Sequence, residues 1–201
     1  MPNILILFAH PALEKSHVHR RLLRSLPELP GLTLNDLYEH YPDYDVDVRR
    51  EQELLSAHDT IVFQHPFYWY SVPPLLKQWQ DLVLEHGWAY GSKGTALRGK
   101  RTVHVISTGG SAAAYQPAAD NQFTVRALLA PWEQTARLCG MDFVPPFVIH
   151  GTHRLTAAGL EIEANRYREF LVALHGGTLR FNPDVLYTDA PARNSMEEAR
   201  Q

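Results

Sequence analysis

Three short segments of this chain carry residue types that could bind a phosphorylated, planar ligand. The segment SHVH at residues 16–19, preceded by His10, offers hydroxyl and imidazole groups beside the free N–H groups of a helix start, which suit a phosphate. Residues 67–70 are four consecutive aromatics, a flat apolar wall for a ring system. The segment STGG at residues 107–110 offers unobstructed backbone N–H donors. The three segments together favour a phosphorylated aromatic heterocycle as ligand.

Each segment taken singly has an ordinary structural explanation, as a helix cap, a packed turn or a loop. Other chemistries lack their patterns. The chain has no GxGxxG fingerprint, Walker A lysine or GxSxG elbow, which disfavours a Rossmann dehydrogenase, a P-loop nucleotidase and a serine hydrolase. Among the eleven histidines, His17 and His19 do not share a helix face and no HExxH or CxxC pattern occurs. We therefore expect no metal site, ordinary surface or helix-end roles for the histidines at 40, 58, 86 and 175, and a buried, unreactive Cys139.

The elements that must position these segments alternate between strand and helix. Strands are expected at residues 4–9, 32–37, 60–65, 101–107 and 143–150, and helices at 16–26, 48–57, 73–84, 124–139 with a break near Pro131, and 156–175. Several strand runs are apolar nearly throughout, which is typical of strands covered on both faces. The sequence predicts an α/β fold, a doubly wound five-stranded parallel sheet with helices on both faces, that binds its ligand beyond the carboxyl ends of the strands.

Length and composition predict one domain. The 201 residues are 45% hydrophobic and 20% charged; we expect a folded domain at 1–181 and a polar C-terminal tail at 182–201. The net charge of −3 argues against a nucleic-acid partner. The apolar N-terminal run is too short to span a membrane, and a single cysteine fits a reducing compartment. The expected location is cytoplasmic, with any membrane association through a protein partner and no direct insertion.

Longer motifs in the chain resemble a known family. They are HPxxxxS at residues 10–16, QHPxxWYSxPPLLKxWxD at 64–81, HGWAYG at 86–91, TGG at 108–110 and PPF at 145–147. Together they are similar to the flavodoxin-like NAD(P)H:quinone oxidoreductases, and most of all to the KefF-type ancillary flavoproteins of glutathione-gated potassium efflux systems. The segment NDLYEHYPDYDVD at 35–47 also resembles that subgroup. The resemblance covers about residues 3–175.

The resemblance implies a bound FMN and a set of residues that contact it. His19 stands where the family usually has asparagine, and Ser107 where it has threonine, and both can still hydrogen-bond. The implied FMN-binding residues are His10, Ser16, His17, Val18, His19, Pro66, Phe67, Tyr68, Trp69, Tyr70, Ser107, Thr108, Gly109 and Gly110. Trp88, Tyr90 and Tyr115 are implied to contact the substrate, and Tyr115 with Asn121 to take the catalytic positions. Asn121 replaces a histidine of the mammalian relatives, so we expect no general acid there.

The resemblance further implies an NAD(P)H dehydrogenase (quinone): FMN takes hydride from NADPH or NADH and passes it to a quinone or similar electrophile. Relatives in this family usually complete the substrate pocket across a homodimer. Two alternatives stay open. One is a regulatory flavoprotein subunit of a potassium/proton antiporter, which is compatible with enzymatic activity, and the other is a flavodoxin-like electron carrier.

Overall fold

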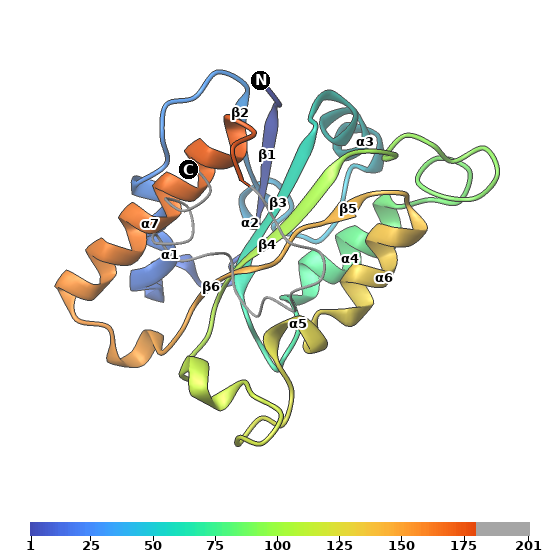
Figure 1. The fold of residues 1–201 in the computed structure, drawn as a ribbon. Coiled ribbons are helices and arrows are strands. Elements are labelled where there is room, and N and C mark those ends of the chain that lie inside the picture. Colours follow the sequence, from blue (N-terminus) through green and yellow to red (C-terminus); the bar gives the residue numbers. More distant parts are fainter. Residues whose placement is uncertain (180–201) are drawn as a thin grey trace.

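A parallel β-sheet forms the centre of the computed structural model, which describes residues 1–179 (Figure 1). Its strands are β1 (Ile4–Phe8), β2 (Leu32–Asp36), β3 (Thr60–Pro66), β4 (Arg101–Ser107), β5 (Asp142–Phe143) and β6 (Phe147–Ile149). They are arranged in the order β2-β1-β3-β4-β5, and β6 also pairs with β4. Every pairing is parallel. The direction of winding reverses between β1 and β3, where doubly wound sheets bind ligands. The predicted α/β fold class is confirmed.

The fifth strand position differs from the single strand expected at 143–150, because two short strands share it. β5 pairs with the start of β4, and β6 pairs with its end. Pro145 and Pro146 lie between them and have no N–H to donate to the ladder, so pairing must stop there and resume at Phe147.

Helices cover both faces of the sheet (Figure 1). On one face, α1 (His17–Arg24) and α7 (Ala157–His175) bury one set of alternate β1 side chains, including Ile6 and Phe8. On the other, α3 (Val48–Ala57), α4 (Pro74–Val83) and α6 (Ala130–Leu138) bury the opposite set, including Leu5 and Leu7. Shorter elements are α2 (Leu37–His40), α5 (Val125–Leu128), η1 (Leu13–Lys15), η2 (Ala112–Ala114) and η3 (Thr152–Arg154).

Helix ends follow the signals in the sequence. The Ser16 and Thr156 hydroxyls accept the N–H groups of His19 and Gly159, each at 3.1 Å, as N-caps do. Gly140 follows α6 with a φ of 71°, a conformation that glycine adopts without steric cost. The break expected near Pro131 lies at Leu129, just before it, because proline suits the first turn of a new helix.

Two histidines that the sequence analysis did not single out form a buried pair between β3 and β4. His65 Nε2 lies 3.0 Å from His104 Nδ1, and His65 Nδ1 donates to the carbonyl oxygen of Pro66 at 2.9 Å. Burial lowers the pKa of His65 to about 4, and burial with the neighbouring His65 lowers the pKa of His104 well below 6.5. Both rings are therefore neutral near pH 7. His104 Nδ1 must donate to His65, because the only proton of neutral His65 is given to Pro66.

Two of the four histidines expected on the surface or at helix ends lie at helix ends, as expected, but are buried. His58, which follows α3, bonds the carbonyl oxygen of Leu54 and the hydroxyl of Thr33. His175, the last residue of α7, lies 3.1 Å from the carbonyl oxygen of Pro2. These partners satisfy the rings inside the fold. Cys139 is buried, as expected.

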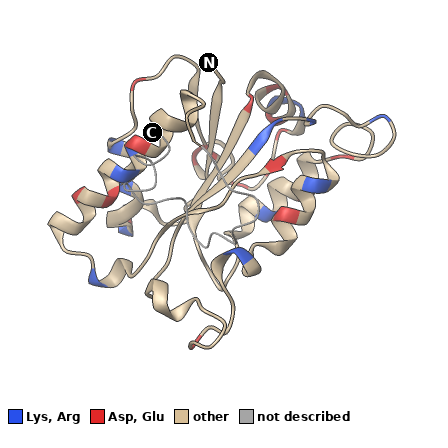
Figure 2. Ribbon diagram, viewed as in Figure 1, with Lys and Arg blue, Asp and Glu red and all other residues tan. Residues whose placement is uncertain are grey.

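Charged residues are dispersed over the outer helix faces. Figure 2 shows Lys and Arg interspersed with Asp and Glu on α7 and on α6, as in the Arg137–Glu133 pair at 2.6 Å. No helix within residues 1–179 combines the length and the apolar composition needed to cross a bilayer. The tail expected at 182–201 lies outside the described residues.

Candidate functional site

A cavity of about 570 Å³ opens where β1, β3 and β4 end. Its volume lies within the roughly 300–1,000 Å³ typical of small-molecule sites. Residues from five separate segments line it: His10, Ala12, Lys15, Ser16, His17, Val18, Pro66, Phe67, Tyr68, Trp69, Tyr70, Ser107, Gly109, Tyr115, Thr152 and His153. The lining contains one lysine and no carboxylate, so it favours an anionic ligand.

The start of α1 supplies the polar end of the cavity. Ser16 Oγ accepts His19 N–H, which leaves the N–H groups of His17 and Val18 without an intrahelical acceptor. Lys15 precedes the cap and also lines the cavity. Amide donors, a lysine and the positive end of the helix dipole converge here, as they do in phosphate sites.

Two buried imidazoles underlie this end. His19 Nε2 lies 2.9 Å from Ser107 Oγ, which joins α1 to the end of β4, and its ring meets the His10 ring edge-on at 5.2 Å. Burial, then the nearby His10 and His65, lower the pKa of His19 well below 6.5, and burial also lowers the pKa of His10. Both rings are neutral at pH 7, so they act as hydrogen-bonding groups. His19 Nδ1 is buried without a hydrogen-bond partner.

The aromatic segment after β3 forms a tight, strained turn. Ser71 N–H donates to Tyr68 O at 2.9 Å, and the two central residues, Trp69 and Tyr70, have φ values of 48° and 63°. Two successive positive φ angles are the signature of type I′ turns, which favour Asn and Gly. Here two bulky residues occupy them, and the Trp69 side chain is 92% exposed. The strain holds an apolar ring at the cavity mouth instead of in the core.

Backbone hydrogen bonds join the glycine loop after β4 to the loop after β6. Thr108 N–H donates to Ile149 O at 2.9 Å, and Gly151 N–H donates to Gly110 O at 2.9 Å. A Cβ at Gly109 would lie 2.9 Å from His153 Nε2, and one at Gly110 would lie 3.1 Å from Tyr115 Cε2. Larger residues would displace side chains that border the cavity, which is a physical reason for two glycines here.

Tyr115 and Asn121 lie beyond this loop. Burial raises the pKa of the Tyr115 hydroxyl, and Tyr70 acts in the same direction. Tyr70 OH donates to Asn121 Oδ1 at 3.2 Å. The Tyr115 ring packs against His150, with ring centroids 5.7 Å apart. Tyr115 therefore stays protonated near neutral pH and can donate a hydrogen bond at the cavity wall.

Comparison with known proteins identifies the family of the fold. A family model described as a flavodoxin-like fold matches residues 2–171. The chain belongs to this flavodoxin-like family. It is 44% identical over 169 residues to the glutathione-regulated potassium-efflux system ancillary protein KefF of Klebsiella aerogenes, covering 84% of this chain and 94% of that protein.

Two solved structures resemble this flavodoxin-like protein closely. General stress protein 14 from Treponema denticola, determined in complex with FMN, is 39% identical, with a TM-score of 0.80 over 87% of this chain and 99% of that one. An NADPH-quinone reductase from P. pentosaceus is 32% identical, with a TM-score of 0.76 over 84% and 96% of the two chains. The sequence-based resemblance to this family is confirmed.

Most of the residues expected to bind the cofactor surround one cavity of the flavodoxin-like fold. His19, Thr108 and Gly110 lie directly behind its lining residues, through the contacts described above. Sequence analysis missed Ala12, Lys15, Thr152 and His153. The last two follow β6, and the rule that ligands gather at strand carboxyl ends could have drawn attention to that loop as well. No cluster of His, Cys, Asp or Glu suited to a metal occurs in the described part of the chain.

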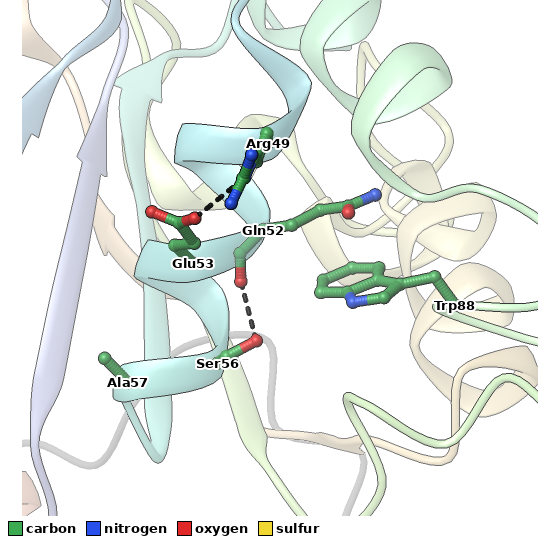
Figure 3. A pocket seen from close by; sticks show the side chains of 6 residues that line it. All are labelled: Arg49, Gln52, Glu53, Ser56, Ala57 and Trp88. Carbon is green, nitrogen blue, oxygen red and sulfur yellow. Dashed lines mark hydrogen bonds and ion pairs between the residues drawn. The ribbon is translucent and has the colours of Figure 1, made fainter.

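Trp88 and Tyr90 lie outside this lining. Trp88 faces α3 across a shallow surface hollow of about 490 Å³, lined by residues that include Gln52 and Ser56 (Figure 3). Tyr90 packs on His86 in the same loop, with ring centroids 5.3 Å apart. Within a single copy of the chain, the structure does not bring these two predicted substrate contacts to the cavity.

Proposed function

We propose that this protein is an FMN-dependent oxidoreductase that transfers hydride from NADPH or NADH to a quinone or a similar electrophile. The observation that carries the proposal is the convergence of the α1 start, the aromatic turn and the glycine loop on one anion-favouring cavity. The FMN-bound and quinone-reductase relatives support it. When bound, FMN supplies the hydride chemistry, and the protein supplies binding and orientation.

The residues present fit FMN. Lys15 and the N–H groups of His17 and Val18 would hold the phosphate, with Ser16 fixing the helix start. The buried His19 ring, held to Ser107 through Nε2, supports the lining from behind.

The other end of the cavity offers the apolar surface and the amide groups that a flavin ring needs. The aromatic turn at 67–70 would give the isoalloxazine ring an apolar wall, and a ring stacked there would cover the exposed Trp69. Gly109 and its neighbours would offer amide N–H groups to the polar edge of the ring, because no side chain blocks the approach.

Around that cofactor, the chain's own groups orient the substrate and exclude water. Tyr115, kept protonated by burial, would donate a hydrogen bond to a developing oxyanion on the acceptor. Asn121, held by Tyr70, cannot donate a proton near neutral pH, so its contribution is positional. A quinone that accepts a hydride would need one further proton, which solvent supplies. The rate would depend chiefly on the placement of the reactants.

The active form is a homodimer in this proposal. Trp88 and Tyr90 lie outside their own cavity, so they would cover substrate only if a second copy presented them. Twofold pairing is the commonest oligomeric arrangement. Light scattering should give twice the mass of the 22.9 kDa chain, and a fully active monomer would contradict this part of the proposal.

A second, compatible function is regulation of a potassium efflux antiporter, favoured by the 44% identity to KefF. If regulation were its sole function, the protein would be a non-catalytic regulatory flavoprotein. The test is efflux from vesicles that contain a cognate antiporter, with and without this protein. Unchanged efflux would remove the regulatory function and leave the enzymatic one untouched.

The decisive experiment for the enzymatic function combines cofactor identification with turnover. Mass spectrometry of the flavin released on denaturation should find FMN, and FMN-loaded protein should oxidise NADPH or NADH only when a quinone is present. Recovery of FAD, or of no flavin after reconstitution, would contradict the cofactor. Flavin without turnover on any quinone would favour the regulator or an electron carrier.

A further inference from the structure

His150, immediately after β6, makes contacts that no function proposed so far uses. Its Nδ1 lies 3.1 Å from Thr108 Oγ1, and its ring packs on Tyr115. Thr108 is 2% exposed, although it belongs to the glycine loop beside the cavity. One side chain from the β6 loop therefore contacts both the hydroxyl within the glycine loop and the tyrosine at the cavity wall.

The hydroxyl of Thr108 determines the direction of these hydrogen bonds. Thr108 Oγ1 donates to the carbonyl oxygen of Gly110 at 2.8 Å, and a carbonyl can only accept. A hydroxyl has one proton, so Thr108 must accept from His150, whose Nδ1 therefore carries a hydrogen. The Tyr115 side chain also interacts with the Thr108 hydroxyl. The Thr108 hydroxyl thus donates to Gly110 and accepts from His150.

We infer that His150 is a positioning residue, which orients the Thr108 hydroxyl and through it both the Gly109–Gly110 backbone and the Tyr115 hydroxyl. The Gly110 carbonyl is held from two sides, by Thr108 Oγ1 and by Gly151 N–H at 2.9 Å. Without the imidazole donor, the Thr108 hydroxyl is free to turn away from Gly110. The loop amides and the tyrosine would then lose a common anchor. The inference rests on the proposed function for its catalytic consequence, but not for its structural one.

The protonation state of the ring does not alter this role. Nδ1 bears a proton both in the neutral tautomer required here and in the imidazolium ion, so it donates to Thr108 in either state. A positioning role therefore predicts no pH dependence of its own. A general acid or base at this position would instead create one limb of the pH–rate profile.

Three substitutions at this position separate the roles. Asparagine places its Nδ2–H group near the position of His Nδ1, whereas glutamine reaches the position of Nε2 and leucine has no donor. We expect both His150→Leu and His150→Gln to speed amide hydrogen exchange in residues 107–116 about fivefold. Both variants should also slow flavin reoxidation by quinone about fivefold. Fivefold is about the factor that one net hydrogen bond typically contributes. His150→Asn should rescue both readouts to within about twofold of wild type, which is less than one hydrogen bond contributes.

A double variant checks the proposed connection. His150→Leu combined with Thr108→Val should be no worse than Thr108→Val alone, because both changes remove the same bond. The pH profile of His150→Asn should match that of the wild-type protein.

Several results would overturn the inference: an asparagine variant as impaired as leucine, additive effects in the double variant, or a lost pH limb in His150→Asn. Hydrogen exchange can be measured without FMN or quinone. If the wild-type protein does not turn over quinone, only the proposed function is contradicted. The exchange pattern would still decide the role of His150. If the leucine variant fails to fold, the comparison of glutamine with asparagine decides it.

Discussion

Acid should destabilise this protein well above the pH at which carboxylates titrate, because of the buried pair His65 and His104. The pKa of His65 is lowered from 6.5 to about 4 by burial, so protonation is disfavoured in the folded state and ordinary in the unfolded chain. The stability contributed by the neutral ring is therefore complete above pH 6.5 and is lost as the pH falls toward 4. His104, whose pKa is also lowered, acts with the same sign.

The magnitude follows from the pKa of His65. A lowering from 6.5 to about 4 is equivalent to about 3 kcal/mol of unfolding free energy, of which about 2 kcal/mol should be lost between pH 7.5 and pH 5. Carboxylates with a lowered pKa, such as Glu133, lose their contribution only as the pH falls below about 4.5. The interval from pH 7 to pH 5 therefore isolates the histidines.

The assay is urea unfolding at a series of pH values for the wild-type protein and for His65→Gln. Glutamine can still accept from His104 Nδ1 but has no proton to take up. The variant should be less stable at pH 7.5, because it loses the bond to Pro66 O, and its stability should fall less steeply with acid, by up to about 1.4 kcal/mol per pH unit. The difference in slope cancels any effect of FMN that the two proteins share. Equal slopes would refute the reasoning, since His65 would then titrate alike in the folded and unfolded states.

Three further predictions concern the cavity. Trp69→Gly should raise the unfolding free energy by about 1 kcal/mol, because glycine adopts a left-handed backbone without strain. It should also weaken FMN binding about fivefold, because the stacking surface is lost. Calorimetry measures the first effect and fluorescence titration the second, and Trp69→Ala should reproduce only the weaker FMN binding. Tyr115→Phe should keep its FMN but lower quinone turnover modestly, with a smaller effect for Asn121→Ala; stopped-flow rates that equal wild type in both half-reactions would exclude a catalytic hydroxyl. Gly109→Ala should displace His153 and weaken FMN binding, and an unchanged dissociation constant would show that the loop backbone does not approach the ligand.

The sequence predicted those parts of the fold that local patterns determine. The apolar runs of β1, β3 and β4 and the caps at Ser16 and Thr156 carry their own signals, and the structure confirms them. A single fifth strand was expected, but its division could have been predicted, because Pro145 and Pro146 have no N–H to pair. The helix α2 was missed, although Asp36 caps it by accepting Tyr38 N–H at 3.1 Å, because four residues are too few to show periodicity.

Features that depend on register lie beyond such patterns. The pair His65–His104 exists because β3 and β4 align Phe63 with His104, and nothing local to either segment indicates that alignment. The contact of His150 with Thr108 likewise depends on the pairing of β6 with the end of β4. The loop after β6, which completes the cavity wall with His153, is a different case. It was missed although it follows the carboxyl end of a strand, where ligands gather.

The two prolines between β5 and β6 also affect how copies of this chain can meet. Both short strands lie at the edge of the sheet, beyond β4. A long edge strand with unpaired N–H and C=O groups would allow another chain to add as a further strand. Successive N–H groups alternate between the two sides of a strand, so Pro145 and Pro146 remove one donor from the outer edge and one from the side that faces β4. The strands on either side are only two and three residues long. Strand addition, the route to open-ended aggregation, is thereby disfavoured along this side. A stable association there would be made by side-chain surfaces, which can close into a discrete assembly.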